Sequence, residues 1–202
     1  MQLVLPENTA SARLILDAPE SLTEEAYLSF CEANPGLRLE RTAKGEIVIL
    51  PPAGGESDYR SLEIAAELRT WAKRDGRGVA FGSSVEFLLP NGAALSPDAA
   101  WVSNDKLARL SKEQRRKFLR LAPDFVAEIM SPSDRLPAAQ AKMLEWIENG
   151  VALAWLINGD AQTIYIYRPA QPPETCQGMT TLAADGPLRG FTINLADLWA
   201  GL

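Results

Sequence analysis

The chain has 202 residues, and its 47% hydrophobic and 23% charged content is ordinary for a soluble globular protein with one core. It contains no histidine, which excludes Ser-His-Asp and Cys-His catalysis as well as histidine-ligated zinc. The net charge of −6 counts against a DNA or RNA partner, although binding depends on local patches more than on total charge.

Carboxylates, lysine and tyrosine remain as candidates for proton transfer, and any divalent metal would be a hard ion on oxygen ligands. No apolar run approaches the ~18 residues of a membrane span, and the N-terminus lacks the pattern of a signal peptide. We therefore expect a cytoplasmic protein with a single domain over residues 1–202. Its residues 1–20 are expected to form an extended lead-in.

The N-terminal part of the chain is predicted to begin with a helix and a hairpin. The helix covers residues 21–34, and Ser21 or Thr23 is expected to be its N-cap. Alternating apolar residues on both sides of a Lys-Gly turn predict a hairpin over residues 37–50. Residues 51–58 are rich in proline and glycine and are predicted to form a loop.

The stretch over residues 59–75 predicts the clearest amphipathic helix of the chain, and Gly76 is expected to end it. The spacing of its apolar residues suggests that one side of the helix is shared by Leu62, Ala65, Ala66 and Arg69.

Strands and helical pieces are predicted for the middle of the chain. After a strand over residues 78–84, a tight turn at Asn91 and Gly92 joins two further strands, and Asp98 lies near the start of the second. Residues 104–122 are predicted to be helical, in one or two pieces. They carry a basic cluster, for which a solvated helix face is the simpler interpretation and a DNA-facing patch the alternative: Lys112, Arg115, Arg116, Lys117 and Arg120.

The C-terminal part is predicted to hold a strand over residues 124–131, a helix over 138–150 and two strands joined by a turn at Gly159 and Asp160. Residues 170–178 are predicted to form a loop, followed by short strands and a terminal helix. The whole is a mixed α/β fold with a central β-sheet flanked by helices, preceded by the N-terminal helix and hairpin.

One carboxylate stands out, because Glu128 interrupts the near-continuous apolar run from Phe125 to Met130. Such a run predicts a strand that is covered on both faces. A carboxylate in that position must be neutralised, paired or bound to a metal.

Asp98, Glu128 and Lys142 form the candidate site. Two carboxylates on neighbouring strands can hold one divalent cation, and the backbone carbonyl of Ile129 can add an oxygen ligand. Such an ion lowers the pKa of a bound water and offsets negative charge at phosphorus. Lys142 lies on the helix after the Glu128 strand, where its ammonium group can orient that water.

Each of these residues also has a simpler interpretation. Asp98 can be a turn or cap carboxylate, and Glu128 can be a partly exposed strand residue. Lys142 can be a surface lysine with a packed aliphatic stem. Spacing alone does not choose between the two interpretations.

Four blocks in order carry a resemblance to a known family: "LPPAGGESDYRSLEIAAELRTWA", "FGSSVEFLLPNGAALSPDAAWVS", "PDFVAEIMSPSD" and "QAKMLEWIENGVALAWLIN". The chain resembles the bacterial family of putative restriction endonucleases, a branch of the PD-(D/E)XK nuclease superfamily with a restriction-endonuclease-like fold. The resemblance runs from about Ser21 to the C-terminus.

The resemblance implies a Mg²⁺-dependent endonuclease, with Mn²⁺ as a substitute, that hydrolyses DNA phosphodiester bonds. The two acids of the superfamily fall on Asp98 and Glu128. The lysine that usually follows two residues after the second acid is replaced by Met130. In the family the lysine comes from the next helix, which corresponds to Lys142.

The superfamily often adds a glutamate from the first core helix, and Glu63 is our choice for it, with Glu56 and Glu67 as alternatives. Two other functions stay open. The chain can be a catalytically silent homodimeric interaction module of the same fold, or a metal-dependent hydrolase of small phosphoesters. A homodimer is expected for the nuclease as well.

Overall fold

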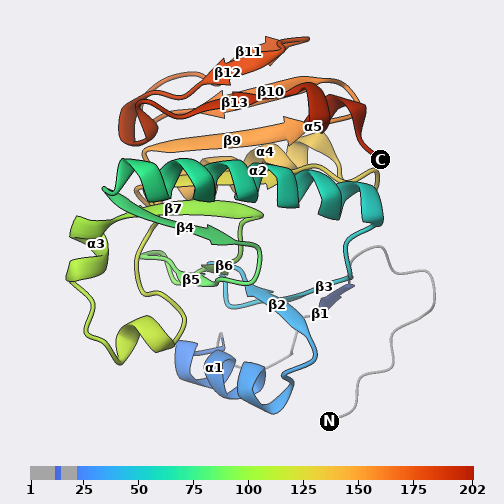
Figure 1. Ribbon diagram of the computed structural model, residues 1–202. Coiled ribbons are helices and arrows are strands. Elements are labelled where there is room, and N and C mark those ends of the chain that lie inside the picture. The colour runs from blue at the N-terminus through green and yellow to red at the C-terminus, as the bar shows by residue number, and fades with distance from the viewer. Residues whose placement is uncertain (1–11, 15–21) are drawn as a thin grey trace.

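The computed structural model describes residues 12–14 and 22–202 (Figure 1). Most of the predicted lead-in over residues 1–20 lies outside this part, and so does Ser21. Residues Ala12–Leu14 form strand β1. Within the described residues, no helix is both long and apolar enough to cross a membrane.

The centre of the molecule is a six-stranded mixed sheet with the strand order β11-β10-β9-β8-β7-β4. Strands β8 and β9 are parallel, and the other neighbouring pairs are antiparallel. In chain order the strands are β4 (Gly78–Gly82), β7 (Ala99–Ser103), β8 (Phe125–Ile129), β9 (Leu153–Asn158), β10 (Thr163–Tyr167) and β11 (Glu174–Gln177).

A second sheet, ordered β1-β3-β2-β6-β5, packs below the first in Figure 1. The predicted hairpin is confirmed, and Gly45 takes a positive φ in its turn. The predicted Asn-Gly turn is confirmed as well, since Gly92 has a φ of +87° between paired strands. The remaining strands of this sheet are β2 (Arg38–Arg41), β3 (Ile47–Leu50), β5 (Phe87–Leu88) and β6 (Ala94–Leu95).

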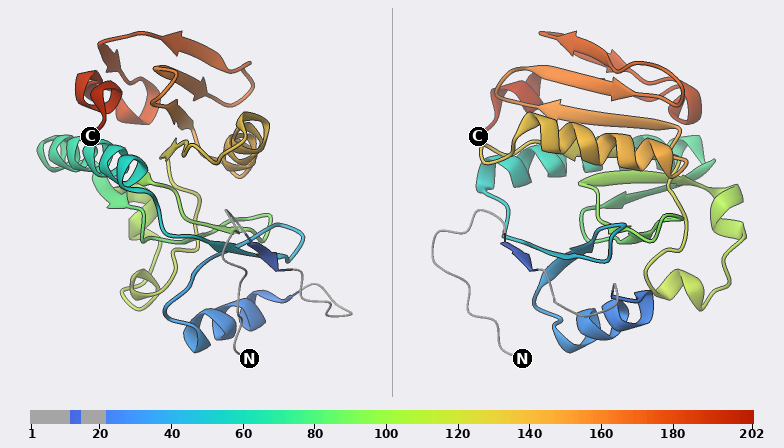
Figure 2. Two further views of the ribbon diagram at one scale, coloured as in Figure 1. Left: turned by 90° about the vertical axis from the view of Figure 1, so that its right-hand side faces the viewer. Right: turned by 180° about the vertical axis from the view of Figure 1, so that it is seen from behind.

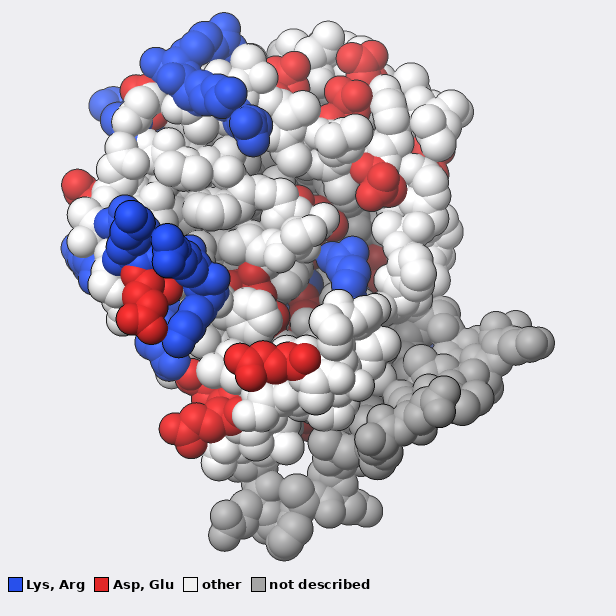
Figure 3. All heavy atoms as spheres, turned by 60° about the horizontal axis from the view of Figure 1, so that its bottom comes forward, with Lys and Arg blue, Asp and Glu red and all other residues white. Residues whose placement is uncertain are grey.

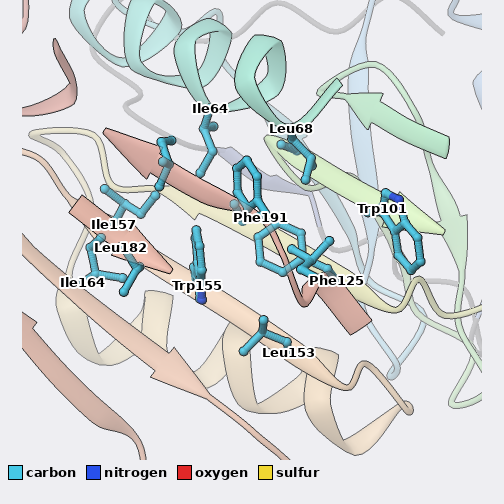
Figure 4. Packing of buried hydrophobic residues seen from close by; sticks show 14 of the residues in the cluster. Ile64, Leu68, Trp101, Phe125, Leu153, Trp155, Ile157, Ile164, Leu182 and Phe191 are labelled. Atoms are coloured by element: carbon cyan, nitrogen blue, oxygen red, sulfur yellow. The ribbon is translucent and has the colours of Figure 1, made fainter. Parts of the chain in front are cut away.

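Two long helices cover opposite faces of the six-stranded sheet: α2 (Gly55–Asp75) and α4 (Leu136–Glu148) (Figure 2). The face under α2 buries Phe125 and Trp155, whose rings meet edge to face at 5.1 Å, and Phe191 stacks on Trp155 (Figure 4). The face under α4 buries Val126 together with the α4 residues Met143 and Trp146. Both faces of β8 are therefore covered, as its apolar sequence predicts.

The alternation along β8 explains the position of Glu128. Phe125, Ala127 and Ile129 pack on the α2 side, whereas Val126 and Met130 pack on the α4 side. Because side chains alternate along a strand, Glu128 points to the α4 side. The apolar run therefore forms a strand that is buried on both faces, and its one carboxylate points toward α4.

The buried side of α2 differs from the prediction. Leu62 is 63% exposed, and the helix instead buries Ile64, Leu68, Trp71 and Ala72, which follow the spacing of a helical face. The helix also begins at Gly55, inside the predicted loop, and ends at Gly76 with a φ of +77°, as predicted. The predicted range contains two sets of apolar residues at helical spacing, and the packing of α2 on the sheet buries the set with the larger side chains.

The smaller elements agree with the prediction in part. Helix α1 (Glu24–Ala33) begins at the N-cap Thr23, as predicted, whereas the predicted loop over residues 170–178 contains strand β11. The predicted helical stretch over residues 104–122 holds only two short pieces. The elements not yet named are α3 (Asn104–Ala108), η1 (Gln114–Arg116), β12 (Thr181–Ala183), η2 (Gly186–Leu188), β13 (Thr192–Asn194) and α5 (Ala196–Ala200).

Gly78 in the edge strand β4 provides a test of this packing. A Cβ atom at Gly78 would come within 2.5 Å of the Trp101 ring and of the Val102 carbonyl oxygen. We expect Gly78→Ala to lower the free energy of unfolding by about 1–3 kcal/mol in urea titrations, because the strand and the ring must move apart. Gly82→Ala, in the same strand but with open space around its Cβ, is the control and should change stability by no more than about 0.5 kcal/mol. Equal stabilities of the two variants would contradict the packing of Trp101.

Candidate active site

Glu128 is held by two residues that lie one turn apart on α4. Its Oε1 atom accepts a hydrogen bond of 2.9 Å from the Trp146 indole nitrogen and lies 3.0 Å from the Lys142 ammonium nitrogen. The Glu128 side chain is 13% exposed. Trp146 is fully buried, and its indole N–H fixes the position of the carboxylate.

Asp98 lies next to Glu128 at the start of β7. The pairing of Ala99 with Ala127, extended by one residue, places Asp98 opposite Glu128 on the neighbouring strand. The Asp98 Oδ2 atom accepts a hydrogen bond of 2.7 Å from the Ile129 amide. In an extended strand the N–H and C=O of one residue point to the same side, so the Ile129 carbonyl also faces the β7 side.

A third carboxylate, Glu40 of strand β2, completes the cluster and was not predicted from the sequence. Its Oε1 atom accepts hydrogen bonds from Lys142 Nζ at 2.9 Å and from the Ser96 amide at 3.0 Å. Glu40 is 6% exposed. Since Ser96 lies two residues before Asp98, the chain that delivers Asp98 also anchors Glu40.

The cluster carries more negative than positive charge. Burial raises the pKa of Asp98. The hydrogen bond from Ile129 and the positive charges of Lys142 and Arg38 lower this pKa, but burial outweighs them. Burial also raises the pKa of Glu128 to about 7; Lys142 opposes this rise, and the charges of Asp98 and Glu40 add to it. Three carboxylates around one ammonium group would have a net charge of −2 if all were ionised, which a buried site cannot hold without compensation.

Lys142 stays protonated in this environment. Burial lowers the pKa of its ammonium group, but the Glu128 and Glu40 carboxylates outweigh burial and raise the pKa above its ordinary value. Lys142 is therefore a fixed positive charge between two carboxylates and is a poor general base at neutral pH.

A further buried acid, Glu86, lies near this cluster. The Tyr27 hydroxyl donates a hydrogen bond to its Oε1 atom. Burial raises the pKa of Glu86 to about 7, with the Tyr27 bond acting against this rise and the charge of Glu40 adding to it. The interior between the two sheets is thus acidic over several residues.

The cluster opens into a cleft of about 580 Å³ between the β2–β3 hairpin and the first turns of α4. Glu40, Glu128 and Lys142 line its floor, and Leu50, Leu95 and Leu156 give it apolar walls. Asp134, Arg135 and Glu145 lie around them. A cleft of this size can admit a nucleotide-sized group.

The predicted third acid from the first core helix lies elsewhere. Glu63 interacts with the Tyr59 hydroxyl, on the side of α2 that faces Asp197. Glu56 forms an ion pair of 2.8 Å with Arg60, and Glu67 is exposed. The structure thus brings together Asp98, Glu128 and Lys142, while the third carboxylate comes from the hairpin instead of α2.

The donor set suits a hard divalent cation. Among the described residues, no group of three or more His, Cys, Asp or Glu side chains is arranged as a metal site. Asp98 and Glu128 are two carboxylates on adjacent strands, with the Ile129 carbonyl beside them, and all three offer oxygen ligands. Mg²⁺ usually takes one or two carboxylates and keeps several waters, so these residues fit Mg²⁺ or Mn²⁺.

Comparisons with known proteins identify the family and the fold of the chain. The model of the Uma2 family, described as "putative restriction endonuclease", matches residues 24–196. A crystal structure of a putative nuclease belonging to DUF820 from Anabaena variabilis is 21% identical and has a TM-score of 0.68, with 80% of this chain and 89% of that chain covered. The likeness shows that the two proteins share a fold. No curated protein matches the chain.

The raised pKa of Glu128 predicts how stability depends on pH without metal. The pKa of Glu128 is about 7 in the folded protein and ~4.3 in an unfolded chain. The protonated Glu128 therefore stabilises the folded protein at low pH, and this stabilisation is lost as the pH rises toward 7. In the presence of a chelator, we expect the free energy of unfolding of the wild type to fall as the pH rises from about 5 to 8. This fall should exceed that of Glu128→Gln by on the order of 1–3 kcal/mol. Urea titrations over this range measure it, and identical pH profiles of the two proteins would contradict the assignment.

Proposed function

The chain belongs to the Uma2 family of putative restriction endonucleases, and from this premise we propose that it is a metal-dependent endonuclease that hydrolyses DNA phosphodiester bonds. The observation that carries the proposal is the contact of Lys142 with Glu40 and Glu128, beside Asp98, at the floor of a cleft. This gives an excess of buried carboxylate oxygen where a divalent cation and a phosphate can meet.

In the proposed site, Asp98, Glu128 and the Ile129 carbonyl would hold Mg²⁺ or Mn²⁺. When bound, the ion supplies Lewis acidity toward the phosphate and lowers the pKa of a water. The protein keeps its ligands in position, because the Ile129 amide fixes Asp98 and the Trp146 indole fixes Glu128. Such fixed ligands need little rearrangement when the ion binds.

Lys142 has the role of a permanent cation in this mechanism. Since the neighbouring carboxylates keep it protonated, it stabilises negative charge on the phosphate oxygens and orients the attacking water. Glu40 is the second carboxylate in contact with the Lys142 ammonium group and can accept a proton from that water. Glu40 thus takes the place that the sequence assigned to an acid on the first core helix.

Two other functions were open from the sequence. A catalytically silent module has no need to keep three carboxylates and a lysine buried together, because such a cluster costs stability. A hydrolase of small phosphoesters remains the second candidate, since the cleft of about 580 Å³ would admit one nucleotide. Cleavage assays with mononucleotide esters and with DNA separate these two functions.

We also propose that the nuclease acts as a homodimer, because two such sites can cut both strands of a duplex in one binding event. Light scattering after size-exclusion chromatography should give twice the chain mass of 22.0 kDa. A monomer at every concentration up to that used for cleavage would contradict this arrangement.

The nuclease activity is tested by cleavage of supercoiled plasmid with Mg²⁺ or Mn²⁺. We expect Asp98→Ala and Lys142→Ala each to reduce the cleavage rate by at least ~10²-fold, because each removes a charge that acts directly on the ion or the phosphate. Equal cleavage by the wild type and Asp98→Ala would mean that another site or a contaminant is responsible.

A matched pair of isosteric variants tests which acid joins the site. Glu40→Gln should lower the plasmid cleavage rate by at least ~10-fold, because the Lys142 ammonium group loses a charged partner. Glu63→Gln should stay within about twofold of the wild type, since its carboxylate interacts with Tyr59 on another face of α2. The opposite ranking of the two variants would restore Glu63 as the third acid.

A further inference from the structure

The charges of the chain are strongly segregated along the sequence. Residues 69–77 and 105–120 carry eleven of the twenty Lys and Arg residues but only three of the twenty-six Asp and Glu residues. These segments therefore have a net charge of +8, while the rest of the chain has a net charge of −14. A total charge of −6 conceals this contrast.

The two segments lie at one end of the fold. The C-terminal part of α2 packs on β4, and α3 packs on both β4 and β7. In Figure 3, Lys and Arg side chains gather in two groups along one side of the molecule, while acidic residues are spread over the rest of that face. We call the exposed cations of the two segments the basic end: Arg69, Lys73, Arg74, Arg77, Arg109, Lys112, Arg115, Arg116, Lys117 and Arg120.

Several of these cations have no acidic partner. Arg77 pairs with Asp75, Lys117 with Glu113 and Arg120 with Glu24. Arg109, Lys112 and Arg116 form no ion pair with any residue that the structure describes. Their charges are therefore available to an external anion.

Helix electrostatics explains only part of the basic end. Lys73 and Arg74 lie in the last turn of α2, where cations complement the helix dipole without any ligand. The cations over residues 109–117 lie mostly outside helices, since η1 spans only Gln114–Arg116. In this second group Arg115 donates a hydrogen bond to the Leu110 carbonyl and Lys117 pairs with Glu113, so the cations left to a ligand are Arg109, Lys112 and Arg116.

The position of the basic end relative to the site suggests its partner. Strand β7 begins one residue after Asp98 and ends at Ser103, directly before α3. At the rise of a strand, its five residues span about 17 Å. β7 therefore runs from the site toward α3, where the second basic segment begins.

The cleft itself cannot supply affinity for DNA, because Glu40, Glu128, Asp134 and Glu145 oppose Lys142 and Arg135 in its lining. We propose that the basic end binds the phosphate backbone of duplex DNA and so delivers a phosphate of the same duplex to the acidic cleft. This inference rests on the proposed nuclease function and names the surface that binds its substrate. DNA binding and phosphodiester hydrolysis would thus take place at two different surfaces of the protein.

The test measures binding without cleavage, by fluorescence anisotropy of a labelled duplex of about 20 base pairs in EDTA at several KCl concentrations. The double variant Lys112→Gln/Arg116→Gln should bind about tenfold more weakly at low salt. The slope of log K against log [KCl] should become shallower by about 2, because two phosphate contacts are lost. Its melting temperature should match that of the wild type, since both side chains are exposed.

The control variant Gln171→Glu/Gln177→Glu changes the net charge by the same two units at the opposite edge of the sheet, near β11. It should bind within about twofold of the wild type. Equal weakening in both variants would mean that only total charge matters, and unchanged binding in Lys112→Gln/Arg116→Gln would mean a merely solvated surface. Either result overturns the inference.

The failure of this inference is distinguishable from the failure of the nuclease proposal. If the basic end binds DNA in EDTA and no metal brings cleavage, only the nuclease proposal fails. If the protein cleaves DNA while Lys112→Gln/Arg116→Gln binds as tightly as the wild type, only the inference about the basic end fails.

Discussion

The contact of one ammonium group with two buried carboxylates is the interaction on which the site depends. Lys142 lies 2.9 Å from Glu40 and 3.0 Å from Glu128, and it connects helix α4 with both sheets. A single positive charge cannot balance these two acids together with Asp98. The protein must therefore take up protons, which the raised pKa of Glu128 reflects, or bind a cation. Such an imbalance of charge lowers the stability of the folded chain at the candidate site.

The fold produces this imbalance by bringing together elements that are distant in sequence. Antiparallel pairing of β7 with β8 places Asp98 beside Glu128, and the helix after β8 returns over the sheet with Lys142 and Trp146 on its buried side. The second sheet adds Glu40 from a hairpin that precedes the whole core. The pairing of β7 with β8 and the short connection from β8 to α4 bring Asp98, Glu128 and Lys142 together. The position of Glu40 depends instead on how the two sheets pack.

This difference explains which parts were predictable from the sequence. The strand at Glu128, the helix at Lys142 and the resemblance blocks are local patterns, and the structure brings these residues together. Glu40 has no local signal, because an acid in an alternating hairpin strand is usually solvent-facing, and only the packing of the second sheet buries it. The prediction of the buried side of α2 was wrong for a related reason: Leu62 and Ile64 both belong to sets with helical spacing, and only the packing on the sheet decides which set is buried.

Binding of a divalent cation to the isolated protein is the most direct measurement of the central charge imbalance. Isothermal titration calorimetry with Mn²⁺ at about pH 7.5, without DNA, should give one site per chain in the wild type. The observed enthalpy should vary with the ionisation enthalpy of the buffer, because binding releases protons. The site should be lost in Asp98→Asn, which keeps the size of the side chain but removes its charge. A wild type that binds no Mn²⁺, or an Asp98→Asn variant that binds it equally well, would contradict a metal site at these carboxylates.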